Sequence, residues 1–350
     1  MRTAAVLTAS ALLAACSGER ADADAPPPAA APKPTAAPSQ APAGAPRLVL
    51  PIDCRIGETC ELQNYVDRDP GPEVQDYRCS TRTYEGHGGV DIRIPDMAAQ
   101  RRGVMVLAAA AGRVARLRDG VADVSVRAAG PASVAGAECG NGVVIDHGDG
   151  WETQYCHLAQ GSVRVKAGET VAAGQPIARV GLSGNTEYPH LHLTVRRGNV
   201  TIDPFRPEAG GACAADASPS AGLWTPEAAA ALAYKPGAVL NAGFAGGPVS
   251  NAQIEAGEVA PPGADPAVLT AYVRAIGLEG GDVLRLRLLG GDGAVLADSR
   301  LPPLDRAKAQ YMMFVGKRRP PQGWPPGASR AEFTVERNGA VVLSRKLTAD

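Results

Sequence analysis

The sequence has no excess of charge of either sign. Its 350 residues include 35 Lys and Arg against 36 Asp and Glu. A protein that binds nucleic acid mainly through charge needs a basic surplus to neutralise phosphates. We therefore exclude nucleic acid as a partner.

Aromatic residues and long apolar runs are also scarce. Aromatic residues make up 4% of the chain, while Gly (41) and Pro (30) are abundant. This composition favours turns, linkers and small β-domains over long helices. The apolar run of residues 4–15 is too short to cross a bilayer as a helix. The length allows two domains.

Residues 1–15 have the layout of a secretory signal peptide, with Arg2 followed by that apolar run. The run ends in Leu13-Ala14-Ala15-Cys16, which resembles the lipobox of bacterial lipoproteins. The resemblance implies cleavage before Cys16 and a membrane anchor on that cysteine; a plain signal peptide cut at an Ala-rich site is the alternative. Ser17, rather than an acidic residue, follows Cys16. This arrangement resembles the sorting signal of Gram-negative lipoproteins that are sent to the outer membrane. We therefore expect an exported protein on the periplasmic face of the outer membrane.

Composition divides the rest of the chain into four segments. Residues 17–46 hold eight prolines and no core-forming residue, so 16–46 is expected to be a lipidated, disordered Pro/Ala-rich tether. Residues 47–213 show short β runs between Gly-rich turns, and 214–224 is interpreted as a linker. Residues 225–350 are expected to form an accessory domain.

The fold class expected for both domains is mainly β. In residues 225–350, Leu284, Leu286 and Leu288 alternate with arginines, and Asn338-Gly339 marks a hairpin turn. This pattern predicts a small immunoglobulin-like β-sandwich. In the first domain, "NGVVIDHGDGWETQYCHL" (141–158) predicts a hairpin turning at Asp149-Gly150. Residues 163–181 indicate strand, turn, strand, and residues 116–139 a surface loop.

Six cysteines remain once Cys16 is set aside, and all fall between residues 54 and 213. An even number in an exported protein suggests disulfides, and six cysteines allow fifteen pairings. No pair has the CxxC spacing of a zinc site. A bridge between Cys139 and Cys156, which would fix the strand that presents His157, is one of the open pairings. The candidates are Cys54, Cys60, Cys79, Cys139, Cys156 and Cys213.

All five histidines lie in the first domain, and four of them have informative settings. His190 and His192 are two apart in a strand-like run, so both side chains point to one face. His157 ends the second strand of the hairpin. His147 lies at the hairpin's other end, roughly 20 Å away, and is interpreted as a surface residue beside the turn.

His87 lies four residues before Asp91 in "GHGGVDI". The two glycines disfavour a helix, so His87 is expected to end a loop and Asp91 to start a strand. The glycines would let both side chains turn toward one point. Such a pair is weak evidence for a metal site when taken alone.

Four linked motifs, "HGGVD", "GNGVVIDHGDGWETQYCHL", "VKAGETVAAGQPIARVGLSGN" and "PHLHLTV", together resemble the lysostaphin-type (LytM-like) zinc metalloendopeptidases of peptidoglycan. The resemblance covers about residues 84–205. It implies a LytM-like antiparallel β peptidase domain over 47–213. It also implies one Zn²⁺ bound by His87, Asp91 and His192, with His157 and His190 as catalytic histidines.

The chemistry agrees with the resemblance. Two imidazoles and one carboxylate leave a fourth position for water, as hydrolytic zinc sites require. One further histidine can act as a base and another can donate to an oxyanion, although the sequence leaves open which does which. The substrate implied by the resemblance is a peptide cross-link between peptidoglycan stem peptides.

Two alternatives use the same segment. A non-catalytic relative could bind the cell wall or activate an amidase, but such relatives usually lack a zinc residue, and the set here is intact. A biotinyl or lipoyl carrier would share the turn pattern but needs an exposed lysine at its hairpin tip, which the corresponding turns do not offer. A protein regulator remains unidentified from the sequence.

Overall fold

The computed structural model describes residues 44–208, 213–217, 222–325, 327 and 330–348. The signal segment, Cys16 and most of the expected tether therefore lie outside the described residues. Residues 38–350 group into one compact unit by their contacts. Among the described residues, no helix has the length and apolar character needed to cross a membrane.

Short strands dominate the described part of residues 44–208. The elements are β1 (Glu61–Asn64), β2 (Val90–Arg93), α1 (Met97–Arg102), β3 (Met105–Leu107), β4 (Gly112–Arg118), α2 (Val126–Ala129), the 3-10 helix η1 (Pro131–Val134), β5 (Asn141–Gly148), β6 (Trp151–Leu158), β7 (Thr170–Val171), β8 (Pro176–Arg179), β9 (His190–Arg197) and β10 (Val200–Ile202).

Strands also dominate from residue 222 onward. The elements are α3 (Pro226–Ala231), β11 (Ala238–Ala245), α4 (Asn251–Ala256), β12 (Val268–Leu278), β13 (Val283–Leu289), β14 (Val295–Arg300), β15 (Lys308–Arg318), β16 (Arg330–Arg337) and β17 (Ala340–Thr348).

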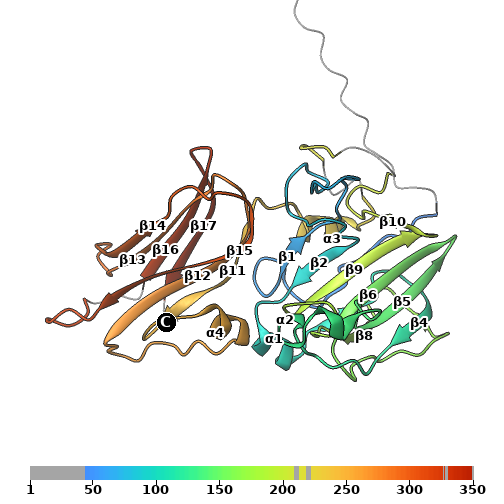
Figure 1. Cartoon of the computed structure of the whole chain (residues 1–350), viewed down its shortest axis with the longest axis horizontal. Helices are drawn as coiled ribbons and strands as arrows, with labels where there is room; N and C mark the ends of the chain where they lie inside the picture. The colour runs from blue at the N-terminus through green and yellow to red at the C-terminus, as the bar shows by residue number, and fades with distance from the viewer. Residues whose placement is uncertain (1–43, 209–212, 218–221, 326, 328–329, 349–350) are drawn as a thin grey trace, which may run out of the picture. The chain divides into compact units, whose positions relative to one another are not determined.

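The main sheet runs in the order β1-β2-β9-β6-β5-β4-β7, with β10 paired to β9 (Figure 1). Every pairing in it is antiparallel. Alternation explains how the strands pack. Leu191 and Leu193 of β9 are fully buried in the core, as are Val143 and Ile145 of β5. Residues between them point to the opposite face, which carries the candidate site.

The 141–158 hairpin forms as expected. Strands β5 and β6 flank Asp149 and Gly150, whose φ angles are 50° and 78°. Positive φ at both turn residues matches the twist of the flanking strands. Asn141 pairs with Leu158, beside His157. The hairpin therefore brings His157 to the middle of the sheet.

One expectation for the first domain is confirmed and another needs correction. Residues 163–181 form strand, turn, strand, and β7 pairs with β4 while β8 pairs with β3. Residues 116–139 are not all loop, because β4 extends to Arg118 and is followed by α2 and η1. Asp123 in this segment accepts hydrogen bonds from the backbone N–H groups of Leu182 (2.7 Å) and Gln160 (3.0 Å). The segment thus stabilises the loop before β9.

The C-terminal strands form two antiparallel sheets, β11-β12-β15 and β14-β13-β16-β17. Leu284, Leu286 and Leu288 of β13 are fully buried and share one apolar core with Phe244 and Ala271 of the other sheet. Asn338 and Gly339, with φ of 52° and 79°, form the predicted turn between β16 and β17. This part is an immunoglobulin-like β-sandwich of seven strands, confirming the mainly β fold class.

One carboxylate joins the sandwich to the main sheet. Glu255 of α4 forms ion pairs with Arg93 of β2 (2.7 Å) and with Arg274 of β12. Arg274 also donates to the Pro95 carbonyl (2.7 Å). The Arg93 guanidinium lies 3.7 Å from the ring centroid of Tyr188, two residues before His190. The sandwich thus contacts a strand and a loop that carry the candidate site.

All six candidate cysteines are paired. The bridges are Cys54–Cys60, Cys79–Cys213 and Cys139–Cys156. The third bridge joins β6 to the segment just before β5.

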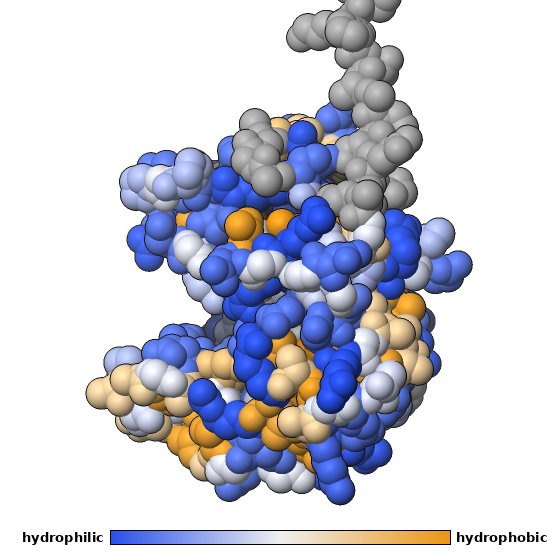
Figure 2. All heavy atoms as spheres, turned by 90° about the vertical axis from the view of Figure 1, so that its right-hand side faces the viewer, coloured by the Kyte–Doolittle hydropathy of each residue, from blue (hydrophilic) through white to orange (hydrophobic). Residues whose placement is uncertain are grey.

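Surface apolar residues are scattered, and one face of the molecule shows mostly hydrophilic side chains with apolar patches among them (Figure 2).

Candidate metal centre and active site

Two paired strands and one loop bring His87, Asp91 and His192 together. Asp91 of β2 is the direct partner of His192 of β9 in the strand register. His87 lies in the loop before β2, and its ring is 2% exposed. A Cβ atom at Gly89 would lie 2.5 Å from His192 Nε2 and 2.8 Å from the Leu193 carbonyl oxygen. Only glycine allows the loop to approach β9 this closely.

The three potential ligand atoms form a tight triangle. Asp91 Oδ1 lies 2.8 Å from His192 Nδ1 and 3.2 Å from His87 Nε2. His87 Nε2 and His192 Nδ1 are 3.2 Å apart. Ligand atoms about 2.0 Å from a tetrahedral zinc ion are about 3.3 Å from one another. The triangle therefore fits a zinc ion with one position left over.

The outer atoms of each of these side chains are also held. His87 Nδ1 is 2.6 Å from the Tyr65 carbonyl oxygen, so that nitrogen carries the proton and donates. Asn64 of β1 donates to Asp91 Oδ2 at 2.9 Å. His192 Nε2 lies 3.1 Å from Thr194 Oγ1. Such outer partners fix ring orientation and tautomer in metal sites.

His157 reaches the site through a β-bulge. The register between β5 and β6 shifts so that Cys156 and His157 lie opposite the single residue Gly142. His157 has φ of 60°, which is rare for a residue with a side chain. The bulge breaks the alternation, so Cys156 and His157 both turn toward the site face. The His157 and His192 ring centroids are 5.9 Å apart.

His157 and His190 present the same nitrogen to the centre. His157 Nδ1 lies 2.9 Å from the Ser183 carbonyl oxygen, and His190 Nδ1 lies 3.0 Å from that of Tyr188. Each Nδ1–H therefore donates to the backbone, which leaves Nε2 as the nitrogen available to the site. His190 Nε2 is 3.4 Å from Asp91 Oδ1. The two rings, 4.7 Å apart, flank the ligand triangle.

The electrostatics match these positions. Burial, reinforced by the nearby His190 and His192, lowers the pKa of His157 well below its usual range. Burial likewise lowers the pKa of His192. Burial alone would raise the pKa of Asp91, but His87 and His190 hold it well below its usual range. Burial alone would lower the pKa of His87, but the Asp91 carboxylate outweighs burial and raises it. Near neutral pH the site thus holds a carboxylate and a neutral His157.

The structure therefore brings five predicted residues together: His87, Asp91, His157, His190 and His192. His147 lies apart from them. Its ring bonds the Ala111 carbonyl (2.8 Å) and Thr153 Oγ1 (2.8 Å), so it supports the hairpin. Lipidation at Cys16 falls outside the described residues.

Sequence reasoning missed three neighbours of the site. Asn64 is 27 residues from Asp91 and belongs to no recognisable motif, so no signal could have found it. Tyr188 stands beside the two histidines of β9, and that proximity was a usable signal. Tyr84 is 52% exposed, and its ring lies 4.3 Å from that of His87.

A β-sheet domain that clusters potential metal ligands with two imidazoles is the class defined by this fold and site. Residues 85–204 match the model of Peptidase family M23. These residues therefore form an M23, or LytM-type, peptidase domain, and the predicted resemblance is confirmed.

Curated relatives match over short segments. The chain is 50% identical over 56 residues to the peptidoglycan DD-endopeptidase ShyA of Vibrio cholerae, covering 15% of this chain and 12% of that protein. It is 39% identical over 67 residues to ShyB of the same organism, covering 19% and 15%. It is 37% identical over 68 residues to the cell division protein DipM of Caulobacter vibrioides, covering 19% and 11%. The chain thus spans less than a sixth of each of these relatives.

Solved structures give matches of low overall similarity. A zinc-containing peptidase from Vibrio cholerae has a TM-score of 0.31 and 24% identity, with 49% of this chain and 41% of that chain covered. The catalytic domain of the M23 protein EnpA from Enterococcus faecalis has a TM-score of 0.32 and 22% identity, with 48% and 99% covered.

Proposed function

We propose that the protein is a zinc-dependent endopeptidase that hydrolyses peptide cross-links of bacterial peptidoglycan. The observation that carries the proposal is the triangle of His87 Nε2, Asp91 Oδ1 and His192 Nδ1, flanked by two imidazoles that are held through Nδ1. A site that only bound cell wall would not need two additional buried histidines beside a metal site.

His87, Asp91 and His192 would hold the ion. Zinc, when bound, supplies Lewis-acid activation of water and of the scissile carbonyl. The Nε2 of His157 or His190 would accept a proton from the attacking water. For His157, the lowered pKa keeps the imidazole lone pair available near neutral pH. The imidazole that accepts the proton would then pass it to the leaving amine and return to its starting form. The second imidazole, when its Nε2 carries a proton, would donate a hydrogen bond to the oxyanion.

The substrate assignment rests on the relatives. Two of them are named peptidoglycan DD-endopeptidases, and residues 85–204 of this chain match the model of Peptidase family M23. If the host is Gram-negative, the bond would be the D-Ala to diaminopimelate cross-link. The proposal extends to location: lipidation at Cys16 would anchor the enzyme at the periplasmic face of the outer membrane, next to this polymer.

The test is hydrolysis of purified cross-linked muropeptides, followed by mass spectrometry. The wild-type protein should convert dimers to monomers with addition of one water per bond. His190→Ala should lower the rate by about a hundredfold or more, because it removes a proton-transfer group. His147→Ala is the matched control, since it removes a histidine outside the site. Intact dimers with the wild-type protein would instead favour a non-catalytic role in binding cell wall or activating an amidase.

A further inference from the structure

The sheet face that carries the site continues to two arginines on β4. In the strand register Thr194 of β9 pairs with Gln154 of β6, Gln154 with Val144 of β5, and Val144 with Arg116 of β4. One row along, Gly142 pairs with Arg118. Paired residues in neighbouring strands point to the same face. Arg116 and Arg118 therefore share a face with His192, three strands away from it.

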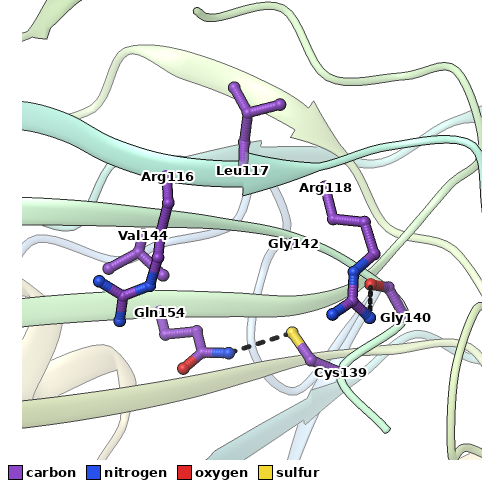
Figure 3. A pocket seen from close by; sticks show the side chains of 8 residues that line it. All are labelled: Arg116, Leu117, Arg118, Cys139, Gly140, Gly142, Val144 and Gln154. Carbon is purple, nitrogen blue, oxygen red and sulfur yellow. Dashed lines mark hydrogen bonds between the residues drawn. The ribbon is translucent and has the colours of Figure 1, made fainter. Parts of the chain in front are cut away.

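A cavity of about 160 Å³ lies at this arginine end of the face. Arg116 and Arg118 extend over it from β4, whereas Leu117 between them points the other way (Figure 3). Gly142 and Val144 form part of its lining, and Gln154 closes the side toward the candidate site. Because Gly142 and Val144 are small or apolar, they leave room for a ligand group beneath the guanidinium groups of the two arginines.

Arg118 is the less paired of the two arginines. Among the residues that the structure describes, no carboxylate lies within ion-pairing distance of Arg118, whose Nη1 makes one long bond of 3.4 Å to the Gly140 carbonyl. Arg116 makes two bonds to Glu152, at 3.1 and 3.2 Å, and its side chain is 61% exposed. Because this pair is open to solvent, a carboxylate of a ligand can compete with Glu152 for Arg116. A guanidinium fork matches a carboxylate in shape and charge.

We propose that Arg118, assisted by Arg116, binds a carboxylate of the peptide substrate and so selects substrates that carry one. The inference rests on the proposed peptidase function, which supplies a peptide lying across this face. Three strand spacings of about 4.8 Å separate β9 from β4, or about 14 Å. An extended peptide covers that distance in about four residues. The group recognised is thus a free carboxylate about four residues from the scissile bond.

The kinetic test compares two synthetic substrates that differ in one group. One peptide carries a free carboxylate four residues from the scissile bond, and its partner carries an amide there. The wild-type protein should show kcat/KM about tenfold or more higher for the acid, as expected for a charge-assisted hydrogen bond. Arg118→Gln should bring the acid down to the level of the amide. Arg102→Gln, at an exposed arginine at the end of α1, should keep the wild-type ratio.

A binding measurement separates this inference from the proposed function. Fluorescence anisotropy of both labelled peptides should give tighter binding of the acid to the wild-type protein and equal binding to Arg118→Gln. If the acid binds more tightly only to the wild-type protein and neither peptide is hydrolysed, the peptidase proposal is wrong and the arginine subsite is supported. Hydrolysis with the same acid-to-amide ratio in wild type and Arg118→Gln would keep the peptidase and overturn the subsite. An absent acid preference in both measurements overturns it as well.

Discussion

At the scale of single residues, Asp91 is the centre of the site. Its Oδ1 faces three imidazoles at 2.8–3.4 Å, and its Oδ2 accepts from Asn64. The side chain is 1% exposed, so solvent cannot replace any of these partners. The orientation of Oδ1 toward the metal position therefore depends on the bond made by Oδ2.

Asn64→Ala should weaken zinc binding by about ten- to a hundredfold, because it removes the bond that orients Asp91. The measurement is competition for zinc with a chromogenic chelator. Asn185→Ala, at an exposed asparagine, is the control and should retain wild-type affinity. Unchanged affinity in Asn64→Ala would show that the rest of the site orients Asp91 without it.

The five histidine and aspartate positions should separate into two groups. His87→Ala, Asp91→Ala and His192→Ala should each lose stoichiometric zinc, while His157→Ala and His190→Ala should retain it and lose hydrolysis. Metal analysis of each purified variant, paired with the muropeptide assay, measures both properties. Loss of zinc in His157→Ala would point instead to the alternative group of His157, His190 and His192 as the ligands.

The sequence was informative where side chains follow a regular period. His190 and His192 share a face because residues two apart on a strand must do so, and their position was predicted correctly. Asn64 was missed because its contact with Asp91 depends on how β1 pairs with β2. Likewise, no local pattern shows that Arg116 and Arg118 lie on the same face as His192.

At the scale of elements, the bulge in β6 and the Cys139–Cys156 bridge act on the same few residues. Cys156 is one of the two residues opposite Gly142, and the His157 N–H donates to the Cys139 carbonyl at 2.8 Å. A Cβ at Gly142 would lie 2.7 Å from Cys139 Sγ. The bulge escaped prediction because it breaks the alternation on which strand prediction depends.

The three disulfides should stabilise the fold unequally. Their sequence separations are 6 for Cys54–Cys60, 17 for Cys139–Cys156 and 134 for Cys79–Cys213. Loop-closure entropy predicts losses of about 2, 3 and 5 kcal/mol on replacing each pair by serines. Urea unfolding of the three double variants gives the order. A loss for the Cys54–Cys60 pair larger than for Cys79–Cys213 would contradict the entropic account.

At the scale of the whole molecule, the described part of the chain contains two β-rich parts joined through buried charge. Arg93 and Arg274 have side chains 0% and 1% exposed and share the carboxylate of Glu255, which is 26% exposed. Buried guanidinium groups require a partner, since their desolvation is costly. Local patterns predicted the sandwich, and the family resemblance implied the peptidase fold. The contact between them joins residues 162 and 19 positions apart and leaves no periodic signal.

Glu255→Ala should lower the free energy of unfolding by about 3 kcal/mol, because it leaves two buried cations without their shared carboxylate. Denaturant unfolding measures the change. Glu258→Ala removes an exposed glutamate two residues beyond α4 and should stay within about 0.5 kcal/mol of wild type. Equal stability of the two variants would mean that the uncharged partners of these arginines, among them Gln310 and Asn241, satisfy them without Glu255.

The central claim is that zinc held by His87, Asp91 and His192 makes this protein a peptidoglycan endopeptidase. The most direct measurement is mass spectrometry of cross-linked muropeptides incubated with the protein as purified, after chelation, and after zinc is restored. The account predicts that dimers become monomers in the first and third samples and remain intact in the second. Equal conversion after chelation, or intact dimers in all three samples, would contradict it.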